Sequence, residues 1–223
     1  MTTSGTYDFN LSNADIITSA YRRIGIRPTE FTQDHLSDGR TELNLWLASA
    51  SNRGPNLWAV DLVTTPLLPA VKTYAVDQST VMILDAYVEI TQVSTAISPL
   101  SRSDYAAIGT KDSQGRPTTF WFDRLTSPTI TMWPVPEQVY SLKYYRYRRL
   151  QDAGVPSGQT ADVPYLFLDC MVAGVAHRLA RIWKPDLEMA RKADADEAWA
   201  IAAAQNTENV PLQLSPGLAG YYR

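Results

Sequence analysis

The chain has 223 residues, of which 45% are hydrophobic and 19% are charged, a composition that is ordinary for a folded protein and too apolar for intrinsic disorder. Its formal net charge is −3 and its pI is about 5.4. Because an acidic protein as a whole repels phosphate, this charge counts against nonspecific binding of nucleic acid.

Two helices are predicted near the start of the chain. In residues 11–25, Ser12 is a favourable cap, Asp15 can bond back to it, and a glycine ends the apolar periodicity. Residues 28–54 repeat the pattern with Thr32 as the cap. The short loop between the two segments predicts an antiparallel pair. The expected apolar stripe of the second helix is Leu36, Leu43, Leu47 and Ala50.

From residue 57 the helical period gives way to short runs of β-branched and aromatic residues. Proline, glycine, serine and aspartate divide these runs, which is typical of an antiparallel β-rich module. We place this module at residues 57–150 and expect one short helix inside it, at residues 101–109.

Two further helices are predicted after a loop of turn-forming residues. Asp162 is the expected cap of a largely buried helix over residues 163–183. A Lys-Pro pair interrupts it, and an acidic, alanine-rich helix able to pack closely on a neighbour follows up to residue 206. The apolar stripe of the first of these helices is Leu168, Val172, Val175, Leu179 and Ile182.

These segments predict an α+β fold. It consists of a four-helix bundle from the N- and C-terminal helices, an inserted antiparallel β-rich module and an extended C-terminal tail. The expected divisions are an N-terminal helical part at 1–56, the β-rich module at 57–150, a C-terminal helical part at 151–206 that packs on 1–56, and a docking tail at 207–223.

The final segment, residues 207–223, has no apolar period and contains two prolines and two glycines. In isolation such a segment is disordered, because it cannot bury enough surface to offset its ordering entropy. It is nevertheless more apolar than a solubilising tail requires, which predicts an extended peptide that docks onto a partner. The residues expected to make this contact are Pro211, Leu212, Leu214, Pro216, Leu218, Tyr221, Tyr222 and Arg223.

The sequence contains few residues that could form an enzyme active site. There is no glycine-rich phosphate loop, and the single cysteine, Cys170, excludes an intrachain disulfide and a thiolate zinc cluster. His177 is interpreted as a structural or surface histidine, and His35 as an ordinary polar residue in the first turn of its helix. Asp194 and Glu197 could act as a catalytic carboxylate pair, but a solvated or subunit-facing acidic surface is the preferred interpretation. We expect no enzyme, no cofactor and no bound metal.

The sequence also argues against export and against membrane insertion. The N-terminus lacks a cationic region followed by an apolar core, and no apolar run approaches the roughly 20 residues that span a bilayer. We therefore expect no signal peptide and no membrane partner. The lack of a second cysteine suits a reducing compartment.

The stretch 141–150, SLKYYRYRRL, interleaves cations with tyrosines. Such a mixture is typical of a groove for single-stranded nucleic acid, but tyrosine and arginine are also enriched where proteins bury surface against each other. The acidic net charge favours an inter-subunit strand, and a nucleic-acid-binding module using residues 141–150 stays open as the alternative. Alternation places Leu142, Tyr144, Arg146 and Arg148 on one face and Lys143, Tyr145, Tyr147 and Arg149 on the other. The candidate inter-subunit residues are Tyr144, Tyr145, Arg146, Tyr147, Arg148 and Arg149.

The order of these segments, with a few local motifs, resembles the head-to-tail adaptor (connector or tail accessory) proteins of tailed bacteriophages. The motifs are ADIITSAYRRIG in the first helix, the turn with Pro134 and Pro136 between two aromatic strands, and DVP at the entry to the third long helix. The resemblance extends from about Ser4 to Asn206 and includes no invariant catalytic signature.

The resemblance implies a structural virion protein. Twelve copies would form a ring below the portal of the filled head, extend the DNA channel, help to retain packaged DNA and offer a platform to the next tail or neck component. The helices would form the wall of the ring, the C-terminal segment would reach the portal, and duplex DNA would pass through the lumen without sequence-specific binding. The implied location is the neck of the virion, after assembly in the bacterial cytoplasm.

Overall fold

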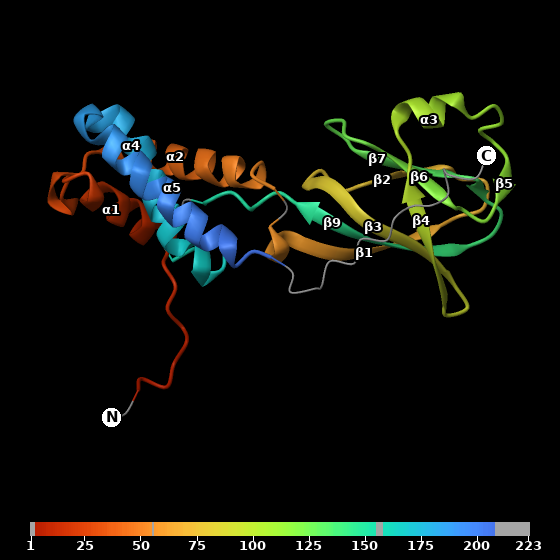
Figure 1. Ribbon diagram of the computed structural model, residues 1–223, viewed down its shortest axis with the longest axis horizontal. Coiled ribbons are helices and arrows are strands. Elements are labelled where there is room, and N and C mark those ends of the chain that lie inside the picture. Colours follow the sequence, from red (N-terminus) through yellow and green to blue (C-terminus); the bar gives the residue numbers. More distant parts are fainter. Residues whose placement is uncertain (1–2, 55, 155–157, 208–223) are drawn as a thin grey trace, which may run out of the picture.

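The protein is described by a computed structural model that covers residues 3–54, 56–154 and 158–207. It is a mixed α+β fold in which the described residues form five α-helices and a curled seven-stranded sheet. Helices α1, α2, α4 and α5 gather at one end of an elongated molecule, and the strands with α3 occupy the other end (Figure 1). No helix among the described residues is long and apolar enough to cross a membrane.

The first two helices start where their capping residues predict. Helix α1 (Asn13–Arg23) begins after Ser12, which forms a capping box with Asp15. Helix α2 (Gln33–Ser51) follows a 3₁₀ turn and begins after Thr32, whose hydroxyl accepts a hydrogen bond from the backbone of His35. Both caps satisfy amides that the first helical turn leaves without partners.

Helices α4 (Leu168–Trp183) and α5 (Glu188–Ala204) are separated by the 3₁₀ turn Pro185–Leu187, as the Lys-Pro break predicts. Helices α1, α2 and α5 all pack on α4. Helix α2 approaches α4 closely at Gly174, where an added Cβ would lie 2.1 Å from Nε1 of Trp46. The contacts between the helices therefore centre on α4. The predicted four-helix bundle remains a prediction.

Three details of the helical prediction were wrong. Asp162 does not cap α4, because its carboxylate is bound to Arg148 and the 3₁₀ turn Tyr165–Phe167 leads into the helix without a side-chain cap. Leu36 is 54% exposed, since the buried position in that turn of α2 belongs to His35. Ile182 is 49% exposed at the end of α4.

The seven-stranded sheet has the order β1-β9-β3-β4-β6-β7-β2. Helix α3 (Arg102–Ala107), capped by Ser101, confirms the predicted short helix between the strands. Two short strands, β5 and β8, form a separate two-stranded sheet. The strands are β1 (Val60–Leu67), β2 (Thr73–Ala75), β3 (Thr80–Ile90), β4 (Val93–Pro99), β5 (Gln114–Gly115), β6 (Thr119–Asp123), β7 (Thr129–Trp133), β8 (Val135–Pro136) and β9 (Tyr140–Arg148).

The sheet is not entirely antiparallel, which corrects the prediction. Strands β4 and β6 pair in parallel over two positions, Ser98 with Thr119 and Pro99 with Phe120, and β5 pairs in parallel with β8. Parallel neighbours need a crossover connection, and α3 lies on the connection between β4 and β6.

Two clusters of buried hydrophobic residues stabilise the two ends of the molecule. One lies among the helices and includes Leu43, Trp46 and Met171, and the other lies within the sheet and includes Phe120 and Leu142. Strand β9 supplies residues to both clusters and runs from the sheet towards the helices (Figure 1). The end of β9 is therefore where the two parts of the protein are joined.

Candidate interaction site

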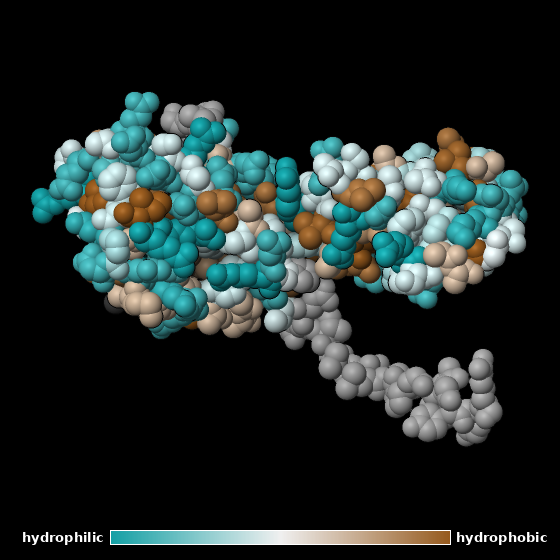
Figure 2. All heavy atoms as spheres, turned by 90° about the horizontal axis from the view of Figure 1, so that it is seen from above, coloured by the Kyte–Doolittle hydropathy of each residue, from teal (hydrophilic) through white to brown (hydrophobic). Residues whose placement is uncertain are grey.

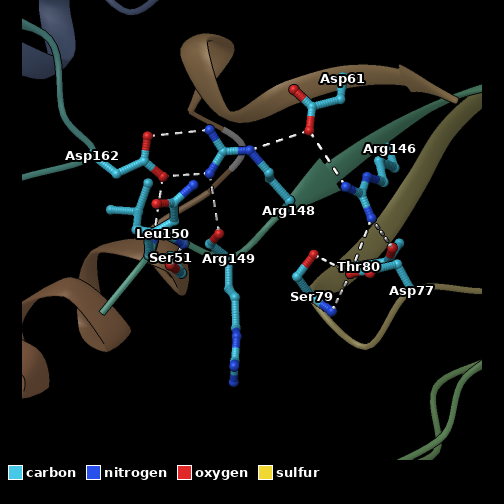
Figure 3. Close-up of polar contacts among 11 residues, drawn as sticks. Ser51, Asp61, Asp77, Ser79, Thr80, Arg146, Arg148, Arg149, Leu150 and Asp162 are labelled. Atoms are coloured by element: carbon cyan, nitrogen blue, oxygen red, sulfur yellow. Dashed lines mark hydrogen bonds and ion pairs between the residues drawn. The ribbon is translucent and has the colours of Figure 1, made fainter. Parts of the chain in front are cut away.

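The site is a cluster of charged residues at the carboxyl end of β9, which we call the junction cluster: Asp61, Asp77, Arg146, Arg148 and Asp162. Its residues come from β1, from the turn before β3, from β9 and from the loop that leads to α4. Figure 3 shows the two arginine side chains reaching across to these carboxylates.

Arg148 joins the sheet to the loop before α4. Its guanidinium forms a two-point contact with Asp162, in which Nη2 lies 3.2 Å from Oδ1 and Nη1 bonds Oδ2. Its Nε lies 3.1 Å from Oδ2 of Asp61. These contacts, above all the hydrogen bonds to Asp162, raise the pKa of Arg148 above its ordinary value, so the side chain is a permanent cation.

Arg146, two residues earlier on the same face of β9, extends the cluster to the turn before β3. Nη1 lies 3.2 Å from Oδ1 of Asp77 and 3.2 Å from Oγ1 of Thr80, and Nη2 lies 3.5 Å from Oδ2 of Asp61. Hydrogen bonds from Ser79, and then the contact with Arg146, hold the pKa of Asp77 below its ordinary value. Asp61 thus bridges the two arginines.

Tyr147 lies on the opposite face of β9 and anchors the strand to α2. Its hydroxyl donates to the carbonyl oxygen of Ser51 at 3.1 Å and accepts from Nδ2 of Asn56 at 3.1 Å. Burial raises the pKa of this phenol. The backbone N–H of Leu150 then donates to the hydroxyl of Ser51 at 3.2 Å. Both faces of β9 are therefore bound to the helical end of the protein.

Pairing within the chain occupies three of the four cations of residues 141–150. Arg146 and Arg148 belong to the junction cluster, and Nζ of Lys143 lies 2.5 Å from Oε2 of Glu89. Among the described residues, only Arg149 of these four cations has no carboxylate partner. A nucleic-acid groove needs cations that are free to meet phosphate, so this geometry does not favour one.

The six candidate inter-subunit residues occupy three kinds of environment. Strand β9 lies between β1 and β3, so its backbone edges are already paired. Tyr144 and Tyr147 are buried, at 3% and 1% exposure, and the two cluster arginines are mostly covered. Tyr145 and Arg149 are exposed and can contact another molecule.

The other residues considered for chemistry are separated in the structure. His35 is buried and stacks on Trp183 with ring centroids 3.9 Å apart. Burial lowers the pKa of His177 and raises that of the Cys170 thiol to about 12. Within the part of the chain that the structure describes, no group of histidine, cysteine or carboxylate side chains is arranged to hold a metal ion.

The two carboxylates predicted as a pair on α5, Asp194 and Glu197, have different surroundings. Oδ2 of Asp194 lies 2.9 Å from Nη1 of Arg191, whereas Glu197 has no ion pair among residues 3–54, 56–154 and 158–207. The predicted docking residues of the tail, Pro211 to Arg223, lie outside the described residues.

Sequence reasoning missed the three aspartates of the junction cluster. One signal was available, because Asp61 pairs directly with Arg146 in the register of β1 and β9, and opposite charges are favourable across two strands. That signal can be used only once the register is known. The contact between Arg148 and Asp162 depends on how the loop after β9 folds back.

A family model described as SU10 adaptor protein matches residues 11–215 of the chain. The match includes every helix and strand that the structure describes in residues 3–54, 56–154 and 158–207. No curated protein matches the sequence.

Proposed function

The chain belongs to the SU10 adaptor protein family, and on this premise we propose that it is a head-to-tail adaptor of a bacteriophage. Copies of the chain form a ring below the portal, extend the DNA channel, help to retain the packaged DNA and connect the head to the next tail or neck component. The ring has twelve copies, is assembled in the host cytoplasm and resides in the virion neck. The family match over residues 11–215 is the observation that carries this proposal.

The elongated fold suits a protein that spans the distance between two partners. The helices lie at one end and the sheet at the other, and the junction cluster joins them through partly buried ion pairs (Figures 1 and 3). A contact made by one end is thereby held at a defined distance from a contact made by the other. The divisions at 1–56, 57–150, 151–206 and 207–223 are part of this proposal.

The charges of the chain support a conduit that does not grip DNA. The net charge is −3, and the cations of residues 141–150 are mainly neutralised by carboxylates of the same chain. A lumen without free cations lets duplex DNA slide, since nonspecific affinity comes from neutralising phosphates. We therefore assign no nucleic-acid site to this stretch.

Two kinds of contact complete the proposal. The C-terminal tail, from Pro211 to Arg223, docks onto the portal, which makes assembly conditional on a partner. Tyr145 and Arg149, the exposed members of the β9 stretch, contribute to the contact between neighbouring copies.

The proposed adaptor role can be tested genetically with a phage that lacks the gene for this chain. We expect heads that package DNA but carry no tails and lose their DNA on purification. Restoring the chain in trans should restore tailed particles. Complete, infectious particles formed without the chain would contradict the proposal.

The role of the tail is tested separately, by binding to the purified portal ring. A chain truncated after residue 206 should stay folded, by circular dichroism, and should no longer bind. The matched control replaces residues 207–223 with a Gly/Ser linker of equal length. Normal binding by either variant would show that the portal contact lies elsewhere in the chain.

A further inference from the structure

Helix α5 turns one exposed face outward, which we call the α5 face: Met189, Ala193, Glu197, Ala200, Ile201 and Ala204. Met189 is 74% exposed and Ile201 is 66% exposed, which is unusual for side chains of their size. The residues of this face, including Met189, Ala193, Glu197, Ala200 and Ala204, recur every three to four residues, so they follow one side of the helix. Glu197 is the charged member of this face.

The opposite side of α5 is the one that packs within the chain. Ala195 and Ala202 are buried there, and Trp199 packs edge-to-face on Trp46 with ring centroids 6.4 Å apart. The α5 face is therefore left for another molecule. Of the other acidic side chains nearby, Asp194 is held by an arginine of the same helix. Asp196 and Glu197 are exposed and have no ion pair within the described part of the chain.

Helix α2 carries a second outward surface, which we call the α2 face: Gln33, Leu36, Ser37, Arg40, Thr41 and Leu45. These residues border a hollow of about 680 Å³. Leu36 is 54% exposed and Leu45 is 48% exposed. Arg40 is the charged member of the face, and it forms no ion pair with any described residue. Figure 2 shows hydrophobic residues at the surface of the helical end of the molecule.

The two faces complement each other but cannot meet within one chain. Each combines two exposed large apolar residues with small or uncharged ones and a charge, negative on α5 and positive on α2, and the exposed carboxylates of Asp196 and Asp34 flank the two faces. Depletion of charge is typical of the buried centre of a protein interface. The inward sides of the two helices meet at Trp46 and Trp199, so their outward faces point away from each other.

We propose that the α5 face of one copy packs on the α2 face of the next, with Glu197 paired to Arg40. A contact between two different faces repeats from copy to copy, and it closes into a ring when the rotation allows. Alanines on α5 permit the two helices to approach near the short end of the usual 8–10 Å range. This inference rests on the proposed function, because it specifies how the proposed ring is held together.

Charge reversal of the full-length chain tests the pairing, with assembly measured by particle mass on the portal of the same phage. The single reversals Arg40→Glu and Glu197→Arg should each raise the concentration for half-maximal assembly by about tenfold, because like charges then face each other. The double reversal should restore assembly. The matched controls, Arg124→Glu and Glu137→Arg, change exposed charges at the sheet end of the molecule and should assemble normally.

A steric variant provides an independent readout. Ala193→Trp places a large side chain on the exposed α5 face, where the isolated chain has room for it, and should block close approach of a second helix. Circular dichroism should show an intact fold for each variant. An assembly defect in Ala193→Trp that is absent from both controls supports the contact.

Three results would overturn the inference. Single reversals that assemble like their controls, or a double reversal that assembles no better than the singles, would show that Arg40 and Glu197 do not meet. Normal assembly of Ala193→Trp would show that the α5 face is not buried. A wild-type chain that stays monomeric beside the portal would instead overturn the ring, and with it the proposed function.

Discussion

Replacement of Arg148 by methionine is the sharpest test of how the helices are joined to the sheet. Methionine keeps an unbranched apolar side chain and removes the guanidinium. The change deletes the two-point contact with Asp162 and the 3.1 Å contact with Asp61. Asp61 keeps a contact with Arg146 at 3.5 Å, but Asp162 loses its cation.

The expected cost follows from the burial of the pair. Removing one partner of a fully buried ion pair costs about 3–5 kcal/mol. Here 17% of the Arg148 side chain and 22% of the Asp162 side chain are exposed, so water recovers part of the lost interaction. We expect the free energy of unfolding to fall by about 2–3 kcal/mol, below the range for full burial. The control Lys72→Met breaks a pair whose carboxylate, on Asp112, is 82% exposed, and should cause no measurable change.

Urea denaturation followed by tryptophan fluorescence measures this cost. A double-mutant cycle with Asp162→Asn isolates the pair, and we expect a coupling energy of about 1 kcal/mol or more because the two side chains touch. If the junction cluster joins the two ends, the transition of Arg148→Met should also broaden, as the helices and the sheet unfold less cooperatively. A loss no greater than that of the Lys72→Met control, or zero coupling, would show that the Arg148–Asp162 pair does not join the helices to the sheet.

Three further predictions concern the helical end. Gly174→Ala should lower the free energy of unfolding by about 1–3 kcal/mol, because the new Cβ would meet Nε1 of Trp46 at 2.1 Å. The control Gly109→Ala, which has open space around it, should leave the free energy of unfolding unchanged. Equal losses for the two variants in urea denaturation would contradict this prediction. Burial lowers the pKa of His177, so the unfolded chain binds a proton first as the pH falls below about 6.5, and stability should decrease over that window. Urea midpoints at pH 7.5 and 5.5 should differ less for His177→Gln, and an unchanged difference would contradict the assignment. The Cys170 thiol, 2% exposed and with its pKa raised to about 12, should resist a thiol reagent at pH 8 until urea unfolds the chain, and rapid labelling of the native protein would refute its burial.

The parts of the fold that depend on neighbouring residues could be predicted from the sequence. Ser12 with Asp15, and Thr32, start their helices because each capping contact spans three residues. The break between α4 and α5 depends on Pro185 alone. The short helix between the strands likewise begins at its local cap, Ser101.

What the sequence did not reveal depends on contacts between distant segments. The parallel pairing of β4 with β6 follows from the path of the connection that carries α3, which periodicity does not encode. Asp162 has the chemistry of a helix cap, but tertiary contact with Arg148 takes its carboxylate. Leu36 fits the apolar stripe of α2, yet it is exposed because His35 stacks on Trp183 in the same turn.

The Tyr/Arg-rich stretch shows the same limit for the candidate site. Its composition fits a nucleic-acid groove and a protein interface equally well. The partners Glu89, Asp61 and Asp162 decide how its cations are used, and they lie in three other segments of the chain. The strand register brings Asp61 and Glu89 to these cations, and the fold of the loop after β9 brings Asp162.

The proposed ring on the portal is best tested by the mass of the complex that the chain forms with the portal. The purified 24.8 kDa chain would be mixed with the portal ring of its phage, and the particle mass measured as the concentration of the chain is raised. We expect a single saturated complex whose mass exceeds that of the portal by twelve copies of the chain. A portal whose mass does not change at saturating concentrations of the intact chain would contradict it.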